Sequence, residues 1–433
     1  MEIKDSNRQN KREKPIFLKV LITSLIVIIS FVGGFFSHYI FQSPHQVVTN
    51  ELLSILEQVG YVIDPITGER KEITSEDVAD ALVNGLLDRY SAYYTPEEYA
   101  KITAEGNGEY EGVGLSFYSS EPVVSRIMGN SPAEKAGFLV GDLIVCASQG
   151  EEENKTFSSS VEFTSYLKEC DSALEITVTV LRNGENVDLS FKKSKYAVSY
   201  VTYYDSEVKY YFQSKEADGE LAPKQIEDKT MAHLSAETAY VCFTQFEGDA
   251  AEQMESALDF MKERGRSKLI LDLRDNGGGY MDILTKIAAM LVYNGGQGNF
   301  LVAYADAKTG GIPFNTSAYN YKDHIEEIVV LADENTASAS ECLIGVLASY
   351  GENFSLDNLV TIKNAKGVGK TYGKGIMQTT YQLISGGAFK LTTARVLWPD
   401  KKTCIHGVGI IPPEANQTND SNAINRALEI LSR

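Results

Sequence analysis

The stretch that decides the fold is IVVLADENTASASE, residues 328–341. Its first five residues, Ile328 to Ala332, are apolar and mostly β-branched, which is typical of a buried strand. A turn of small residues comes next, and the apolar residues between Ser340 and Tyr350 predict a helix directly after the turn. Ser338 is therefore expected at the carboxyl end of a strand and beside the start of a helix.

Strand and helix signals also alternate in the preceding part of the chain. The expected strands and helices lie at Tyr240–Phe246, Ala250–Arg264, Lys268–Leu273 and Met281–Tyr293. A glycine loop, Arg274–Gly279, joins the last two. Such alternation predicts an α/β catalytic core over residues 196–433, with helices covering a mixed or largely parallel sheet. Because ligands bind at the carboxyl ends of strands in such sheets, the glycine loop and Ser338 are expected at one edge.

A second segment, TYGKGIMQ at Thr371–Gln378, places a lysine between two glycines. A serine hydroxyl becomes a nucleophile when a nearby base takes its proton. A lysine is such a base when burial lowers its pKa. Lys374 could approach Ser338 on a tight backbone, and Gln378 could orient the lysine amine through its side-chain carbonyl oxygen. The two segments together predict a serine/lysine hydrolase with Ser338, Lys374 and Gln378 as catalytic residues.

The backbone around Ser338 offers donors for the negative charge that develops during acyl transfer. The N-terminus of the following helix directs the N–H of Ala339 toward that charge. The glycines after Asn276 let the N–H of Gly278 approach the same point without a Cβ in the way. We therefore expect Gly278 and Ala339 to form an oxyanion hole. A helix cap at Ser338, a surface lysine at Lys374 and a phosphate-binding glycine loop are alternatives for the single features, but not for their combination.

Short β signals and glycine turns mark residues 105–195. This region opens with Gly112-Val113-Gly114-Leu115, continues through a short helix at Ser131–Gly137, and has another helix at Val161–Glu169 between strands. The order resembles a PDZ domain, in which such a glycine loop presents N–H groups to the C-terminal carboxylate of a peptide. The resemblance implies that Gly112, Val113, Gly114 and Leu115 bind a substrate tail. A small β-rich module with a structural role is the alternative.

The N-terminal part of the chain carries targeting signals. Basic residues dominate positions 1–19, and Val20–Phe41 is a run of 22 residues without a charge. That length matches the roughly 20 residues needed to cross a bilayer, and the basic flank predicts a cytoplasmic N-terminus with the rest outside the cytoplasm. We expect an uncleaved transmembrane anchor in the cell membrane at 20–41 and a helical segment at 42–104. A cleaved signal peptide and a buried core helix are the alternatives.

Composition argues against several classes of function. A net charge of −19 argues against a nucleic-acid surface, which needs a basic patch. The five histidines form no HExxH pattern and the five cysteines no metal-ligand spacing, so we expect neither a metal nor another cofactor. An odd number of cysteines cannot all pair within one exported chain. Cys242 and Cys342 lie in apolar runs that are typical of buried positions.

Three motifs resemble the signatures of the C-terminal processing (tail-specific) peptidases: LDLRDNGGG at Leu271–Gly279, SASE at Ser338–Glu341 and YGKGIMQ at Tyr372–Gln378. The resemblance extends to Gly85–Tyr94 and to Trp398–Pro399 followed by Gly407–Pro412. It covers nearly the whole chain beyond residue 41. Residues 196–238 fit the family pattern poorly and are interpreted only as a connector that contains strands.

The resemblance implies a role for each motif residue. Ser338, rather than Ser340, is the implied nucleophile, with Lys374 as the general base and Gln378 as its orienting partner. The serine and the lysine are 36 residues apart, a wider gap than the family usually has. The additional residues are interpreted as a surface loop at Glu352–Gly369.

The motifs and the resemblance predict a membrane-anchored serine endopeptidase that cuts extracytoplasmic proteins near their C-termini. Its expected partners are protein or peptide substrates with a free C-terminus, and the membrane through the N-terminal anchor. Two alternatives remain. One is an adaptor with a PDZ domain and an inactive hydrolase core, and the other is a hydrolase in which Ser338 works with His406.

Overall fold

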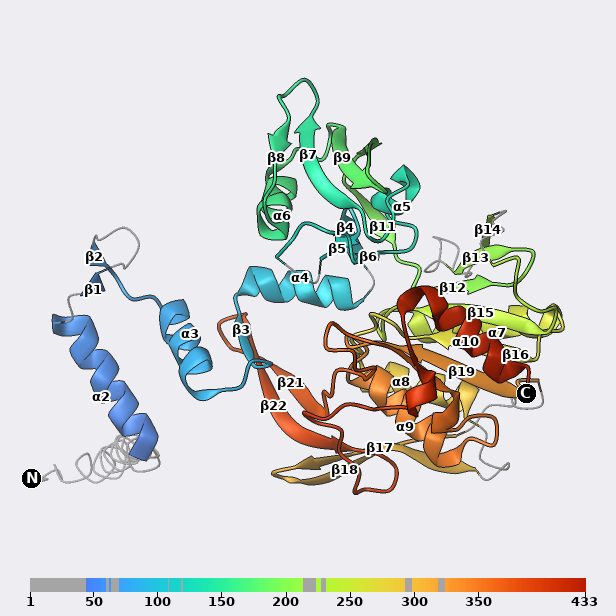
Figure 1. Ribbon diagram of the computed structural model, residues 1–433. Coiled ribbons are helices and arrows are strands. Elements are labelled where there is room, and N and C mark those ends of the chain that lie inside the picture. The colour runs from blue at the N-terminus through green and yellow to red at the C-terminus, as the bar shows by residue number, and fades with distance from the viewer. Residues whose placement is uncertain are drawn as a thin grey trace, which may run out of the picture. The chain divides into compact units, whose positions relative to one another are not determined.

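The structure, a computed structural model, describes residues 44–59, 62–63, 70–107, 109–117, 120–212, 223–226, 231–292, 298–317 and 324–433. They belong to two compact units, Met1–Leu82 and Val83–Arg433. Figure 1 shows the helices and strands of both units. The second unit contains every residue predicted for the site.

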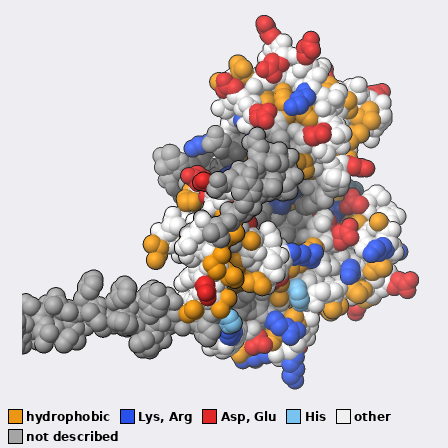
Figure 2. All heavy atoms as spheres, turned by 90° about the vertical axis from the view of Figure 1, so that its left-hand side faces the viewer, with side chains coloured by type: hydrophobic (Ala, Val, Ile, Leu, Met, Phe, Trp, Pro, Cys, Tyr) orange, Lys and Arg blue, Asp and Glu red, His pale blue; other side chains and the backbone are white. Residues whose placement is uncertain are grey.

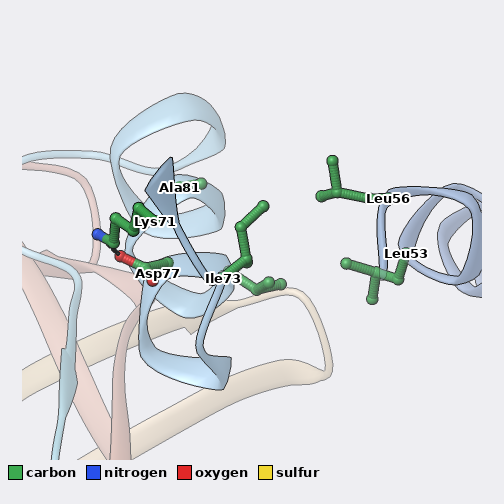
Figure 3. A pocket seen from close by; sticks show the side chains of 7 residues that line it. Leu53, Leu56, Lys71, Ile73, Asp77 and Ala81 are labelled. Carbon is green, nitrogen blue, oxygen red and sulfur yellow. Dashed lines mark hydrogen bonds and ion pairs between the residues drawn. The ribbon is translucent and has the colours of Figure 1, made fainter. Parts of the chain in front are cut away.

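The first unit is made of short elements. They are α2 (Pro44–Val59), β1 (Val62–Ile63), β2 (Arg70–Lys71) and most of α3 (Ser75–Leu86). Leu53 and Leu56 of α2 face Ile73 and Ala81 across a hollow of about 340 Å³ (Figure 3). Helices therefore occupy much of the segment 42–104, as the sequence predicts.

The prediction of a transmembrane helix in the fold is wrong for the residues that the structure describes. Among the residues that the structure describes, no helix is both long and apolar enough to cross a membrane. The first of them, α2, has 16 residues and includes Glu51 and Glu57, so it falls short of a bilayer's width. The predicted span at 20–41 and the basic tail at 1–19 lie outside the described residues.

The core of the second unit is an eight-stranded sheet in the order β14-β13-β12-β15-β16-β19-β20-β23. Its parallel strands are β15 (Thr238–Phe243), β16 (Lys268–Asp272), β19 (Glu327–Ala332), β20 (Leu359–Ile362) and β23 (Gln417–Thr418). Its antiparallel edge is β12 (Val201–Tyr204), β13 (Lys209–Phe212) and β14 (Pro223–Ile226). The expected mixed α/β core is confirmed, and the connector at 196–238 supplies the antiparallel edge.

Helices cover both faces of this sheet. The helices are α7 (Ala250–Glu263), α8 (Met281–Leu291), α9 (Ala339–Tyr350) and α10 (Ala423–Leu431). Ile328 and Val330 of β19 belong to the core cluster that contains α7, α8 and α9, whereas Val329 and Leu331 pack in the cluster that contains α10. A strand that is buried on both faces has to be apolar throughout, which explains the sequence of β19.

The prediction of a surface loop at Glu352–Gly369 is also wrong, because this segment contains a strand. Leu359 to Ile362 form β20, which lies between β19 and β23 within the central sheet. Leu359 and Val360 are fully buried. The segment is apolar and β-branched because it is a sheet strand, and only its flanks are loop-like.

A second sheet carries the lysine segment. Its strands are β3 (Ala92–Tyr94), β17 (Asn299–Ala307), β18 (Gly310–Ser317), β21 (Ile376–Gln382) and β22 (Ala388–Leu397). All its neighbouring strands are antiparallel. Strand β3 pairs with β22 through residues 92–94 and 388–390, so the segment before the PDZ-like region reaches the strands that follow Lys374.

The PDZ-like region has its own core. It contains β4 (Glu109–Gly112), β5 (Leu115–Ser116), β6 (Arg126–Ile127), α5 (Pro132–Ala136), β7 (Leu143–Gln149), β8 (Lys155–Thr156), α6 (Ser160–Glu169), β9 (Ile176–Arg182), β10 (Glu185–Phe191) and β11 (Ser194–Ala197). Its buried residues, such as Phe163 and Val178, form a cluster separate from that of the central sheet. Acidic side chains are prominent over this region, at the top of Figure 2.

Candidate active site

The serine turn has the form that the sequence predicts. Ser338 follows β19 and is the N-cap of α9, with φ 57° and ψ −114°. Positive φ is strained for a residue with a Cβ, and such strain is concentrated at functional sites. Ser338 is half-buried, whereas Ser340 is fully buried and donates its hydroxyl to the carbonyl oxygen of Asn276 at 3.0 Å. Of the two serines, Ser338 is the more accessible to a substrate.

The Glu341 carboxylate joins the serine turn to the lysine segment. Its Oε2 accepts the N–H groups of Ser338 at 3.0 Å and Lys374 at 2.9 Å. Its Oε1 accepts the N–H of Gly373 at 2.8 Å and the hydroxyl of Thr371 at 2.5 Å. One fully buried side chain therefore binds the backbone of both predicted catalytic residues.

Two opposing effects act on the pKa of the Glu341 carboxyl group. Burial raises the pKa of its carboxyl group above the usual value, while its hydrogen bonds from Thr371, Lys374, Gly373 and Ser338 oppose that shift. No catalytic role for this residue is evident from the sequence, although a serine followed three residues later by a glutamate is a capping-box signal. That signal could have identified its bond to Ser338, but not its bonds to the lysine segment.

Lys374 lies half-buried beside the serine turn. Burial lowers the pKa of its amine, and nearby Lys390 acts in the same direction, while Asp88 and Glu341 oppose it. Its Nζ lies 5.2 Å from the centroid of the Tyr90 ring. Among the contacts of the described residues, no hydrogen bond joins Lys374 to the Ser338 hydroxyl. The structure thus brings the two backbones together, and within the described part of the chain no hydrogen bond joins these two side chains.

The glycines on either side of Lys374 are explained by a loop that packs on them. A Cβ on Gly373 would lie 2.7 Å from the nitrogen of Gly409, and a Cβ on Gly375 would lie 2.7 Å from the nitrogen of His406. The Gly407 N–H also donates to the carbonyl oxygen of Gly373 at 2.8 Å. Only glycine allows this close approach of two chain segments.

Gln378 lies on β21, opposite Thr392 of β22. Its Nε2 donates to the Thr392 hydroxyl at 3.1 Å. No hydrogen bond between the side chains of Gln378 and Lys374 occurs among the described residues. Its role as the orienting partner of the lysine therefore stays a prediction.

Gly278 and Ala339, the expected oxyanion donors, lie side by side. A Cβ on Gly278 would lie 2.8 Å from the Ala339 nitrogen and 2.8 Å from the Cβ of Ser338. In this arrangement the Gly278 N–H donates to Oδ1 of Asn276 at 3.0 Å. The Ala339 N–H has no hydrogen bond among the residues described. An oxyanion hole from these two groups stays a prediction, and it requires Gly278 to exchange Asn276 for the substrate.

Two acids, Asp275 and Asp333, join the glycine loop to the serine turn. The Asp275 N–H donates to Oδ1 of Asp333 at 3.1 Å, and Asn335 donates its amide to Oδ1 of Asp275 at 2.8 Å. Burial, together with the Asp333 carboxylate, raises the pKa of Asp275 to about 7. This pair is not evident from the sequence, because the two residues are far apart in the chain.

Arg126 of the PDZ-like region reaches the same place. Its guanidinium donates to the carbonyl oxygen of Thr244 at 2.5 Å and, more weakly, to that of Asp275 at 3.4 Å. Arg126 lies on β6, which pairs with β5 at the end of the predicted tail-binding loop. The PDZ-like region is therefore bonded to the backbone that carries the glycine loop.

The predicted tail-binding residues form a continuous loop at the start of β5. Gly112 pairs with Ser194, and Leu115 pairs with Ile127. A Cβ on Gly114, whose φ is +83°, would lie 2.2 Å from the Cβ of Ser131, so no larger residue fits there. Phe117, just after β5, packs edge-on against Phe163 of α6, with 5.8 Å between the ring centroids. Strand β5 and helix α6 therefore lie close together, as peptide binding by Gly112, Val113, Gly114 and Leu115 requires.

The alternative partner, His406, is next to the lysine segment through its backbone nitrogen and its Cβ, which face Gly375. Its side chain is exposed, and none of the carboxylates in the described ranges contacts its ring. No group of three or more potential metal ligands occurs within the part of the chain that the structure describes.

The fold and the site define a serine-type peptidase with a PDZ domain. Residues 237–415 match peptidase family S41, and residues 110–192 match the PDZ domain family. The region 237–415 therefore belongs to peptidase family S41, and the combination with a PDZ domain is similar to that of the C-terminal processing peptidases.

Relatives with similar organisation are found in staphylococci. A probable CtpA-like serine protease of Staphylococcus aureus (strain COL) is 26% identical over 412 residues, which is 94% of this chain and 72% of the relative. A probable CtpA-like serine protease of Staphylococcus epidermidis (strain ATCC 12228) is 26% identical over 415 residues, with 94% and 73% covered. Among solved structures, the photosystem II D1 C-terminal processing protease is 22% identical, with 88% of this chain and 94% of that chain covered and a TM-score of 0.49.

Proposed function

We propose that this peptidase cuts protein substrates near their C-termini with Ser338 as the nucleophile and Lys374 as the general base. The observation that carries the proposal is the Glu341 carboxylate, whose Oε2 accepts the backbone N–H groups of both residues. The direction of the lysine pKa supports it as well, because burial makes the amine easier to deprotonate.

The chemistry proceeds in two steps. Lys374 takes the proton from the Ser338 hydroxyl as its oxygen attacks the carbonyl carbon of the scissile bond, and then gives that proton to the departing amine. A water molecule, deprotonated by the same amine, releases the acyl group. The oxyanion is bound by the N–H groups of Ala339 and Gly278, at the N-terminus of α9. Gln378 orients the lysine amine through its carbonyl oxygen once its side chain turns from Thr392.

The substrate tail binds at the PDZ domain. The N–H groups of the loop from Gly112 to Leu115 bind the free carboxylate, and the tail adds as a strand beside β5. The packing of Phe117 on α6 supports this geometry, because it places a helix next to that strand. That the substrates are met outside the cytoplasm stays a prediction from the N-terminal sequence.

Proteolysis of an unstructured protein such as casein by the full chain tests the nucleophile. Ser338→Ala should lower the rate by about 10³-fold or more without unfolding, because the side chain of Glu341 binds the Ser338 backbone and not its hydroxyl. Ser340→Ala is the matched control, and it should keep measurable activity. Full activity in a folded Ser338→Ala protein would refute the assignment. A wild-type chain that binds tails and cuts none would favour the adaptor.

A matched pair of peptides tests the tail site. The free-acid form should be cut about tenfold faster than the amidated form at low concentration, because amidation removes a charge-assisted set of hydrogen bonds. Without either peptide, a small activated ester should still acylate Ser338, because this reaction does not need the tail site. Equal cleavage of both peptides would mean that the PDZ domain does not bind the tail carboxylate.

A further inference from the structure

The amine of Lys374 faces an aromatic ring from a distant part of the chain. Its Nζ lies 5.2 Å from the centroid of the Tyr90 ring, within the distance at which a cation is attracted to an aromatic face. No hydrogen bond of this amine is found among the contacts of the described residues. The face of the Tyr90 ring is therefore a direct partner of the lysine amine.

The Tyr90 ring is held in place by Arg89. The Nη2 of Arg89 donates to the phenol oxygen of Tyr90 at 2.8 Å and to that of Tyr372 at 2.7 Å. The two phenol oxygens lie 3.4 Å apart. Because Tyr372 is two residues before Lys374, Arg89 connects the ring to the lysine segment itself.

The turn that carries Tyr90 is anchored to the sheet below the lysine. The Asp88 carboxylate accepts the N–H groups of Tyr90 and Ser91 and the Ser91 hydroxyl, each at 3.0 Å. Ser91 also accepts the N–H of Thr392 at 3.3 Å. Thr392 in turn accepts the amide of Gln378. The turn at 88–91 is thus bonded to the same strand position as the predicted partner of the lysine.

A ring contact suits a base better than a strong hydrogen-bond acceptor does. A carboxylate or carbonyl oxygen on the amine would favour the ammonium and hinder loss of its proton. A cation–π contact is weaker, so it can fix the position of the amine at a smaller cost to its basicity. The charged and titratable groups around Lys374 are Lys390 of β22, Glu341 of α9, and Asp88, Arg89, Tyr90 and Tyr372.

We propose that Tyr90 is a positioning residue for the catalytic base, with Arg89 and Tyr372 fixing the ring on which the lysine amine rests. The inference rests on the proposed serine/lysine mechanism. It gives the segment before the PDZ domain a direct part in the active site. Because Arg89 also lies over the ring, with its Cζ 4.9 Å from the centroid, the aromatic ring and not the phenol group is predicted to be what the base requires.

The test is the pH dependence of acylation of the full chain by a small activated ester, with the Ser338→Ala rate subtracted. In Tyr90→Leu, an apolar side chain still shields the amine but has no π face. The acid limb of the profile should move to lower pH by about half a unit, and the plateau rate should fall several-fold because the amine is less ordered. Tyr90→Phe keeps the ring and should leave the acid limb within about 0.2 unit of wild type.

Tyr94→Leu is the matched control, since Tyr94 is a half-buried tyrosine on β3 without a documented contact to Lys374. It should not move the acid limb, whatever its effect on thermal stability. A Tyr90→Leu profile identical to wild type would overturn the inference alone, provided that Lys374→Met is inactive. If Lys374→Met is acylated at the wild-type rate, the serine/lysine mechanism and this inference both fail.

Discussion

The serine side and the lysine side of the active site are built in different ways. Ser338 lies on one contiguous strand, turn and helix, and the first nine residues of α9 are buried. Lys374 lies on a half-buried segment that is held by the loop at 404–410, by β22 and by the turn at 88–91. The position of the nucleophile is thus set locally, while that of the base depends on contacts between distant segments. The geometry of the lysine side therefore depends on more segments of the chain than that of the serine side does.

Replacing the base should have the largest effect on activity, and this effect should come from the lysine side alone. Lys374→Met should lower peptide hydrolysis by about 10³-fold or more, because the general base is lost. It should also raise the thermal midpoint at pH 7, because burial of the amine lowers its pKa and therefore disfavours the charged form in the folded state. Lys366→Met, at an exposed lysine, is the control. An active or a less stable Lys374→Met protein would contradict this account.

Glu341→Gln should disturb both sides together. The glutamine keeps one acceptor oxygen, but its amide nitrogen would face at least one of the N–H groups that the carboxylate accepts, so the variant should lose about 3 kcal/mol of unfolding free energy. Catalysis should fall about 100-fold, since small displacements of reacting groups have effects of that size. Urea unfolding and peptide hydrolysis measure the two effects. Glu334→Gln, on the same turn and exposed, should change neither. A loss of activity with unchanged stability would mean that Glu341 acts in the chemistry and does not join the two sides.

The smallest effect is expected on the serine side. The pKa of Asp275 is about 7 in the folded protein and near 4 when unfolded, so folded Asp275 binds a proton between these values. Its contribution to stability is therefore present below pH 4 and lost as the pH rises to 7. Asp333→Asn removes the facing charge and should reduce the loss of stability between pH 4 and pH 7 by on the order of 1 kcal/mol.

Urea unfolding at pH 4, 5.5 and 7 measures that slope. Asp306→Asn, at an exposed position on β17, should leave it unchanged. A slope that is equally steep in wild type and Asp333→Asn would show that the Asp333 carboxylate does not raise the pKa of Asp275.

The features that the sequence predicted well are those with local signals. The strand, turn and helix around Ser338 follow from adjacent residues, and so does the glycine loop at 274–279. The parallel order of β15, β16 and β19 follows from the alternation of strands and helices. Ser338, the expected nucleophile, is also the more accessible of the two serines, because the hydroxyl of Ser340 is buried and donates to the carbonyl oxygen of Asn276.

The features that it missed depend on long-range contacts. Tyr90 and Tyr372 are hydrogen-bonded although they are 282 residues apart in the chain, and no local sequence pattern predicts that contact. The bonds of Glu341 to Gly373 and Lys374 are of the same kind. The strand β20 was misjudged because the gap between motifs was interpreted as an insertion, although Leu359 to Ile362 have a strand composition. The transmembrane helix was expected from a hydrophobic run outside the described residues.

The way in which Glu341 is bonded has a practical consequence. Three of its four partners are backbone N–H groups, and these remain when the side chain of Ser338 or Lys374 is changed. An inactive Ser338→Ala chain should therefore keep the geometry of the active site and bind a substrate there without cleaving it. Such a variant can serve as a trap, from which the natural substrates are recovered and their tails read by mass spectrometry.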